Sequence, residues 1–486
     1  MDTAHKKYLL TALSITTLGA FMAGLDARIV VVGLDVIASA LKADIEEALW
    51  FTQAYMLGST LMLLLAGKLA DLYGRVKLYA YGFLLFTLGS ILSGAAATPL
   101  QLAASRFLQG LGAGVLTTLS ATIITDVAVG GPLAFALSIN SLAFRLGSIL
   151  GLTASGLIIG LLGWRGIFYV NVPVGIAGAI LSRKRLRETY TPREKPLIDW
   201  VGFCLFTVSL LGLLLALTFY AYGLSYRSFA RLLLLVSAAC FLLFIAVEAR
   251  SDHPILDLSL FRIWGFTGGN IAQFLNAVAF GAVMLLLTLY YEVALRKSAF
   301  ETGISLLPFE LSFLAFGLLS GRLSDRYGYV KFAILGLLVG SLAQLLLGGL
   351  TVSTSPALVA AYSALLGAGN GLFLSPNTSA IMSSVPPERR GVASAIRAIV
   401  FNVGMTISLN IAVILISTRI PYETVTQLLV GAELMTSDTA TSRALLVDAI
   451  AYTFRVLALV NLSAALFSFT RLKGGKTGRA LPVLAE

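Results

Sequence analysis

Apolar runs of about 20 residues recur along the whole chain, separated by short polar segments. Each run is long enough to cross a hydrocarbon layer of roughly 30 Å as a helix. Backbone groups in lipid must be satisfied within one segment, and the short alternating pattern of barrel strands is not seen. The pattern predicts fourteen spanning helices: Leu9–Ala40, Trp50–Ala70, Leu78–Ala97, Leu100–Val127, Phe135–Leu162, Gly166–Leu181, Ile198–Thr218, Phe229–Val247, Gly265–Tyr291, Thr302–Leu323, Phe332–Leu350, Pro356–Ser383, Gly391–Thr418 and Asp448–Phe469.

Composition supports this all-helical integral membrane fold. Hydrophobic residues make up 58% of the 486 positions and charged residues only 12%, against roughly 25% charged in a soluble domain. The first apolar run follows Lys6 and Lys7 and lacks a small-residue cleavage site, so we interpret it as an uncleaved span. No soluble domain is expected, and the longest connections are Ser182–Pro196 and Arg419–Val447.

The net charge of +11 does not alter the expected fold, but its distribution predicts how the chain is oriented across the membrane. Most Lys and Arg residues fall in connections that the span pattern places on one side of the membrane. That asymmetry predicts cytoplasmic termini in a cell (plasma or inner) membrane and disfavours a nucleic-acid partner. The densest cluster lies in one connection and comprises Arg183, Lys184, Arg185, Arg187, Arg193 and Lys195.

An internal repeat divides the chain. The segment Gly67–Lys77 reappears as Gly321–Lys331, with seven of eleven positions identical at a separation of 254 residues. Duplicated halves are typical of secondary transporters, and this separation corresponds to eight helices. We therefore expect a six-helix bundle over residues 1–197, two additional helices over 198–250 and a second six-helix bundle over 251–486.

Four motifs, in order along the chain, carry a resemblance to a known family. They are the repeated segment, the triad Arg106, Gln109 and Gly110, the stretch Trp164–Pro173, and His253–Pro254 followed by Leu260–Arg262. Together they resemble the major facilitator superfamily, specifically its fourteen-helix drug:proton antiporters. The resemblance implies the major facilitator fold, with a substrate site between the halves near the membrane midplane.

Two departures from the family pattern leave the direction of coupling and the substrate class open. Leu152 stands where the antiporter motif of the fifth helix has proline, which removes an expected helix distortion. In the first helix, Arg28 and Asp35 replace a threonine and a proline of the family motif.

The repeated segment is the candidate gate. Its glycines permit tight turns, and the resemblance implies that Asp71 meets the start of the helix near Gly391–Ser394 while Arg75 completes a cytoplasmic latch. The alternative is a charged turn that only fixes topology. The gating candidates are Gly67, Asp71, Gly74, Arg75, Gly321, Asp325, Arg326 and Gly328.

Ionisable residues within spans are costly in lipid, so they are candidates for proton coupling. Asp26 has the cavity-facing position that the family implies, with Arg106 near it; the alternative is a structural ion pair. On a continuous first helix, Asp35 faces away from Asp26 and shares a face with Arg28. Glu310 is the remaining candidate. It could bind a proton or attract a cationic substrate, and the alternative is a solvated carboxylate at the cavity mouth.

The candidates for lining the substrate cavity are Arg28, Arg145, Asn270, Gln273, Asn276, Asn370, Arg397 and Asn402. Arg145 and Arg397 could pair with Asp26 or Asp126, or give the cavity a positive lining suited to anions. For the amides, hydrogen bonding between helices explains each position as readily as substrate contact does.

No cofactor or metal is expected. Cys204 and Cys240 lie in apolar spans, and both histidines lie outside the spans, which excludes a histidine proton relay. The segment Gly474–Thr477 imitates the end of a P-loop but lacks its first glycine. The proton gradient is the expected energy source.

The leading hypothesis is a secondary transporter, not an enzyme, that exports lipophilic or amphiphilic, mainly cationic, compounds by alternating access coupled to protons. Its partners would be a small or lipid-like substrate, protons and the bilayer, and the chain would act as a monomer. A lipid, organic-anion or metabolite transporter on the same fold is the first alternative. A non-transporting membrane scaffold or sensor is the second.

Overall fold

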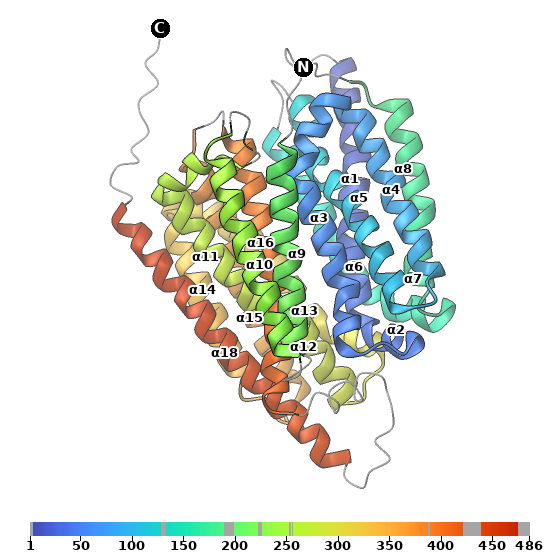
Figure 1. The fold of residues 1–486 in the computed structure, drawn as a ribbon, viewed down its shortest axis with the longest axis vertical. Coiled ribbons are helices and arrows are strands. Elements are labelled where there is room, and N and C mark those ends of the chain that lie inside the picture. The colour runs from blue at the N-terminus through green and yellow to red at the C-terminus, as the bar shows by residue number, and fades with distance from the viewer. Residues whose placement is uncertain are drawn as a thin grey trace. The chain divides into compact units, whose positions relative to one another are not determined.

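The computed structural model describes residues 3–127, 133–188, 199–221, 226–251, 254, 256–386, 389–420 and 439–474, and this part of the chain is helical and contains no strand. Figure 1 labels the α-helices, and the two short helices η2 and η3 are named in the same chain order. They are α1 (Thr3–Val32), α2 (Leu34–Leu41), α3 (Ile45–Tyr73), α4 (Arg75–Ala95), α5 (Pro99–Val127), α6 (Leu133–Leu162), α7 (Gly166–Tyr169), α8 (Asn171–Arg185), α9 (Trp200–Ala221), α10 (Arg227–Glu248), η2 (Leu258–Arg262), α11 (Trp264–Phe280), α12 (Val283–Leu289), η3 (Tyr290–Ala294), α13 (Ala299–Tyr327), α14 (Tyr329–Leu347), α15 (Pro356–Ser383), α16 (Arg390–Ser417) and α18 (Thr439–Gly474).

Thirteen helices in the described part of the chain are long and apolar enough to cross a membrane. The 29-residue helix α3 is the remaining long one and brings the set to the fourteen expected from the sequence. The all-helical membrane fold predicted from the apolar pattern is therefore confirmed.

The chain forms two compact units. The first contains Met1–Ile255, Ala282–Leu307 and Leu409–Ile450, and the second contains Leu256–Gly281, Pro308–Ser408 and Ala451–Glu486. The boundaries 197 and 250, which come from the sequence repeat, remain a prediction about how the halves arose.

Small residues let the helices of the first unit approach closely. Helix α6 packs against α1, where Gly147 lies against the Phe21 carbonyl and Gly151 against the Leu25 carbonyl. These are glycines of the altered fifth-helix motif, and α6 continues unbroken past Leu152 to Leu162. Close approach of backbones is how helices gain contact in lipid, so the motif here acts as a packing surface that fixes the residues before Asp26.

The duplication extends from the loops into helix packing. Gly110 on α5 lies against the Tyr55 carbonyl of α3, and Gly367 on α15 lies against the Phe309 carbonyl of α13. Tyr55 and Phe309 are separated by 254 residues, as the two loop segments are. The two units therefore repeat one arrangement of two packed helices.

The loops repeat in conformation as well. Gly74, between α3 and α4, has φ 96° and ψ 135°, and Gly328, between α13 and α14, has φ 101° and ψ 130°. L-residues with a side chain rarely adopt such positive φ values. The two glycines are thus required by the same tight connection in both copies.

The first predicted span is shorter than expected. Helix α1 ends at Val32, and Gly33, with φ −101° and ψ 13°, separates it from α2. The prediction of one continuous helix to Ala40 is wrong, and so is the argument that placed Arg28 and Asp35 on one helix face. Residues 33–44, which include α2, instead connect α1 to α3, so Asp35 lies outside both spanning helices.

The predicted span Gly265–Tyr291 is also interrupted. Helix α11 ends at Phe280, α12 resumes at Val283, and the chain closes in the π-helix η3. In η3 the Leu295 amide donates to the Tyr290 carbonyl five residues earlier, at 3.1 Å. A π-helix inserts an extra residue into the turn and is frequent at functional sites.

Candidate functional site

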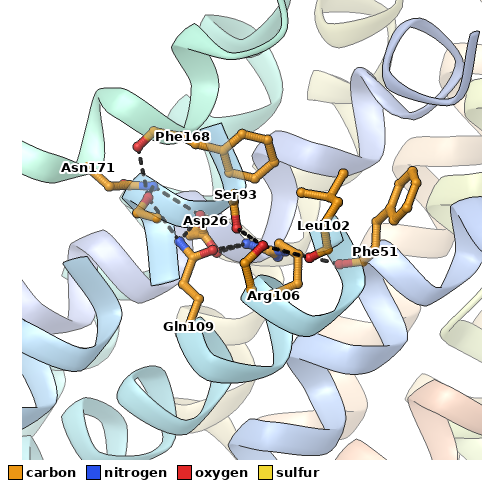
Figure 2. A network of polar contacts seen from close by, with 10 residues as sticks. Asp26, Phe51, Ser93, Leu102, Arg106, Gln109, Phe168 and Asn171 are labelled. Carbon is orange, nitrogen blue, oxygen red and sulfur yellow. Dashed lines mark hydrogen bonds and ion pairs between the residues drawn. The ribbon is translucent and has the colours of Figure 1, made fainter. Parts of the chain in front are cut away.

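A polar network is buried inside the first unit. Asp26 comes from α1, Arg106 and Gln109 from α5, and Asn171 from the start of α8. The four side chains are between 0% and 2% exposed. Figure 2 shows them converging from different helices on the Asp26 carboxylate.

Both oxygens of Asp26 accept hydrogen bonds. Arg106 Nη1 lies 2.6 Å from Asp26 Oδ2 and forms an ion pair with it. Asp26 Oδ1 accepts from Gln109 Nε2 at 2.9 Å and from Asn171 Nδ2 at 3.0 Å. The carboxylate is therefore held by one cation and two amides.

Arg106 is fixed from several directions. Its Nε donates to the Phe51 carbonyl on α3 at 3.0 Å, and Nη1 also donates to Gln109 Oε1 at 2.7 Å. The guanidinium lies 4.3 Å from the centroid of the Tyr55 ring, a cation–π geometry. Arg106 and Gln109 share a helix face because they are three residues apart.

Ser90 of α4 closes the network. Gln109 Nε2 donates to Ser90 Oγ at 3.2 Å, and Ser90 Oγ donates to the Phe168 carbonyl at 2.8 Å. The site thus ties together α1, α3, α4, α5 and the α7–α8 segment. The three contacts made to Asp26 itself depend on its carboxylate being charged, because a neutral acid neither neutralises Arg106 nor offers two acceptors of equal strength.

The observed environment of Asp26 is that of a buried ion pair. The sequence resemblance implied a cavity-facing carboxylate, whereas this side chain is fully enclosed. Its proximity to Arg106 agrees with the expectation from the two motifs. Asn171 was not among the residues that we selected from the sequence, although it lies within the Trp164–Pro173 motif.

The first copy of the loop contains a second ion pair. Arg75 Nη1 lies 2.6 Å from Asp126 Oδ1 on α5 and bonds both oxygens of that carboxylate. Glu188 caps the start of α4, since the backbone amides of Arg75 and Val76 donate to its carboxylate at 2.6 and 3.1 Å. From the sequence, Asp126 was considered only as a partner of Arg145 or Arg397. Glu188 was not selected, because it lies in a basic connection where a helix cap was not sought.

The second copy of the loop differs. Tyr329 occupies the position of Arg75, and Arg326 is exposed, with its guanidinium 5.5 Å from the centroid of the Tyr327 ring. The side chains of Asp71 and Asp325 lie outside the described residues, as do the surroundings of Gly391. The gating role of the repeat, including that of Gly67 and Gly321, therefore stays a prediction.

Several amide candidates connect helices of the second unit. Asn276 Nδ2 donates to Asn370 Oδ1 at 3.3 Å and to Asn461 Oδ1 at 3.0 Å. Asn270 Nδ2 donates to the carbonyl of Phe266 at 2.9 Å. These are the interhelical and local hydrogen bonds that were the alternative to substrate contact.

A buried arginine was missed in the same unit. Arg471 on α18 is 5% exposed and donates to Asn377 Oδ1 at 2.7 Å. Asn377 in turn donates to Gln273 Oε1 at 3.3 Å and to the Gly269 carbonyl at 3.1 Å. The predicted span ended at Phe469, two residues before Arg471, which is why the sequence did not mark it as buried.

The remaining candidates are placed as follows. Glu310 is 4% exposed on α13, two residues after Pro308. Arg28, Arg145, Arg397 and Asn402 are half-buried. Asp26 and Asp126 were the acids considered as partners of Arg145 and Arg397, and they form ion pairs with Arg106 and Arg75. In the described part of the chain, no cluster of three or more His, Cys, Asp or Glu side chains could hold a metal ion.

A set of spanning helices arranged as a duplicated unit, with a charged pair buried among them, defines a polytopic membrane transporter. The chain belongs to the Major Facilitator Superfamily, whose sequence pattern it matches over residues 16–269 and 269–472. It is therefore a transporter of that superfamily and not an enzyme.

Curated relatives include named drug transporters. The chain is 34% identical over 409 residues to the Multidrug resistance protein Stp of Mycobacterium tuberculosis, covering 83% of this chain and 75% of Stp. It is 30% identical over 410 residues to the Multidrug transporter protein MdtP of Bacillus subtilis, covering 84% and 74%. The Riboflavin transporter RibZ of Clostridioides difficile is 28% identical over 396 residues, covering 81% and 85%.

A solved structure shares the fold. The bacterial homologue of the human lysosomal transporter Spinster, in its inward-facing and unoccupied conformation, superimposes with a TM-score of 0.73. The superposition covers 99% of this chain and 100% of that one at 15% identity.

Proposed function

We propose that this protein exports lipophilic or amphiphilic, mainly cationic, compounds in exchange for protons, with Asp26 as the main proton-binding group. The similarity to multidrug transporters supports the substrate class. The observation that carries the proton coupling is the buried pair of Asp26 and Arg106, with Gln109 and Asn171 on the same carboxylate.

The network offers a physical route from a proton to helix movement. Protonation of Asp26 removes the charge that neutralises Arg106 and turns one acceptor oxygen into a donor. The amides of Gln109 and Asn171 then lose an acceptor, so the links between α1, α5 and α8 weaken together. A buried guanidinium without its counter-charge is strongly unfavourable. The uptake of one proton therefore favours a rearranged packing of these helices, which is what alternating access requires.

The test is transport by the purified protein in proteoliposomes under an imposed pH gradient, with a lipophilic cationic dye as substrate. Asp26→Asn keeps the shape of the protonated side chain, so we expect uphill accumulation to stop while dye counterflow without a gradient persists. Asp448→Asn, which changes an exposed acid on α18, is the matched control and should behave as the wild type. Accumulation at the wild-type rate in Asp26→Asn would contradict the assignment.

A second candidate function rests on Arg397. Its Nε is buried and has no hydrogen-bond partner among the described residues, and a relative is named as a riboflavin transporter. A half-buried guanidinium with an unsatisfied donor suits an organic anion or metabolite. The same vesicles loaded with riboflavin or an organic anion separate the two functions, since Arg397→Gln should then abolish anion transport and leave dye transport intact.

We also propose that both termini are cytoplasmic. The basic connection that includes Arg183 and Arg185 at the end of α8 supports this orientation. Single cysteines near residues 5 and 480, in a background without Cys204 and Cys240, should both react with a membrane-impermeant reagent only in inverted vesicles. Labelling of the two ends from opposite faces would contradict an even number of spans.

A further inference from the structure

Two acidic side chains of the first unit meet away from the Asp26 network. Asp35 lies on α2, directly after the break at Gly33, and Glu292 lies in the π-helix η3. Their carboxyl groups interact directly with each other.

The polar side-chain atoms of Asp35 and Glu292 are buried, and three of them lack a hydrogen bond of good geometry. Asp35 Oδ1 and both carboxylate oxygens of Glu292 are inaccessible and have no hydrogen-bond partner of good geometry among the described residues. The hydroxyl of Thr302 on α13 is also unpartnered, its side chain is 0% exposed, and it adjoins the Glu292 carboxyl. Four polar atoms from three elements thus converge on one point.

The charged groups on the neighbouring elements have other contacts. The Lys297 ammonium donates to Ser305 Oγ at 2.9 Å and lies 4.7 Å from the centroid of the Tyr291 ring. Glu301 accepts from the Ser298 amide and hydroxyl.

On α3, the Glu47 carboxylate accepts from the backbone amide of the N-cap Asp44, and the Asp44 carboxylate accepts from the backbone amide of Glu47. Glu46 of α3 and Arg28 of α1 are further charged groups on elements beside α2. Lys42, at the C-cap of α2, and Arg296, just after η3, are exposed. The interactions acting on the Asp35 carboxyl come from Glu292 and from the amides of Asp35 and Val36.

The pair sits where a later segment packs against the first helices. Helix α12, just before η3, contacts α1, and Gly303 of α13 lies against the Leu152 carbonyl of α6. Asp35 and Glu292 therefore connect α2 to the segment Ala282–Leu307 within the first unit.

Electrostatics makes a proton the natural ligand here. Two adjoining carboxylates without a cation repel each other strongly in a medium of low dielectric constant. One shared proton removes half of the charge and creates a short charge-assisted hydrogen bond. Burial also raises the pKa of Asp35.

We propose that Asp35, Glu292 and Thr302 form a second proton-binding site, which clasps α2 to η3 while one proton is shared and releases it when that proton is lost. The Thr302 hydroxyl donates to the free oxygen of Glu292 when the proton lies on Asp35. This site is separate from Asp26 and holds irrespective of which substrate the protein transports.

The test measures the distance between the two elements as a function of pH. Spin labels at Ser39 of α2 and Phe300 of α13, both exposed, are read by pulsed dipolar spectroscopy in nanodiscs on a background without Cys204 and Cys240. In the wild type we expect the short-distance population to fall at least about twofold between about pH 6 and about pH 10. Loss of the shared proton shifts the equilibrium between the clasped and released arrangements of α2 and η3 toward the released one.

Variants assign the titration. Asp35→Asn and Glu292→Gln each leave one carboxyl group beside one amide. The amide donates a hydrogen bond to the carboxylate, so no shared proton is needed. The distance distribution should therefore no longer follow the wild-type pH curve. Glu301→Gln, a nearby exposed acid, is the control and should follow it. If one variant fails to fold, as judged by size-exclusion chromatography, the other still tests the site.

Three results would overturn the proposal. They are a wild-type distribution that is constant with pH, retention of the wild-type curve in both variants, and loss of the curve in Glu301→Gln. Asp26→Asn should keep the distance response while losing proton-driven transport. Failure of the clasp and failure of the proposed export function are therefore distinguishable.

Discussion

Arg106 Nη1 lies 2.6 Å from Asp26 Oδ2, and both side chains are buried in the first unit. Removing one partner of this buried pair destabilises the fold more than removing one partner of a surface ion pair does. Breaking a buried pair by removing one partner costs about 3–5 kcal/mol, because the other charge is left uncompensated, whereas an exposed pair contributes about 0–1 kcal/mol.

The first prediction is that Arg106→Ala lowers the free energy of unfolding by about 3–5 kcal/mol at neutral pH. The double variant Asp26→Asn/Arg106→Ala should recover part of this loss, since neither charge remains. Thermal unfolding in detergent, followed by tryptophan fluorescence, measures both. Additive losses in the two single variants would show that the residues do not act as a pair.

The second prediction concerns the pH dependence of transport. Arg106→Gln keeps a polar side chain but removes the cation that forms an ion pair with the Asp26 carboxylate. The pH of half-maximal dye efflux should move upward by about one unit or more, the shift that corresponds to about 1.4 kcal/mol. The rate of dye transport in proteoliposomes, measured as a function of pH, checks this. An unchanged pH profile would show that Arg106 does not take part in proton coupling.

The third prediction compares the two positive-φ glycines. Alanine at either Gly74 or Gly328 should cost about 1–2 kcal/mol through the backbone alone. A Cβ on Gly74 would also lie 2.9 Å from Glu188 Oε2, while a Cβ on Gly328 meets nothing within 4 Å. Gly74→Ala should therefore lower the melting temperature more than Gly328→Ala, and the reverse order would contradict the role of Glu188 as the cap of α4.

The fourth prediction addresses the proposed gate. Asp71→Asn should slow dye transport while leaving membrane insertion intact, and Asp325→Asn should be milder because Tyr329 replaces the basic residue that Arg75 supplies in the first copy. Initial rates at equal protein density compare the two. Full activity in both variants would reduce the duplicated loops to topology signals.

The fifth prediction concerns Glu46, in the first turn of α3 and before the predicted apolar span Trp50–Ala70. Burial, with Asp44 adding to it, raises the pKa of Glu46 to about 9. The folded state therefore holds this proton after the unfolded chain has lost it at about pH 4.5. The stabilisation is complete below about pH 4.5 and is lost as the pH rises to about 9. Melting temperatures from pH 5 to 9 should fall less steeply in Glu46→Gln than in the wild type, with Glu47→Gln as the neighbouring control.

The fold was largely predictable because its main signal is apolar length. The loop repeat also predicted that the same tight turn occurs twice, and Gly74 and Gly328 share one backbone conformation. The breaks within the first and ninth predicted spans were not predictable. Gly33 and Gly281 resemble the many glycines that stay helical elsewhere, and only packing decides which of them interrupts a helix.

The site was predictable only in part. Motif residues such as Asp26 and Arg106 were selected because charge in lipid is expensive. Asn171, Glu188 and Glu292 were missed because an amide or acid near a helix end looks ordinary in sequence, and its partner lies more than a hundred residues away. Contacts of this kind depend on the tertiary structure.

The shared packing of Gly110 and Gly367 has a consequence for the ancestry of the protein. It aligns Arg106 with Ser363 and Tyr55 with Phe309 in the second unit. Ser363 is fully buried, and Phe309 stacks on Phe280 at 5.5 Å between ring centroids. After the duplication, one copy acquired or kept an ionic centre at this position and the other an aromatic one. The ancestral geometry persisted in both copies while their chemistry diverged.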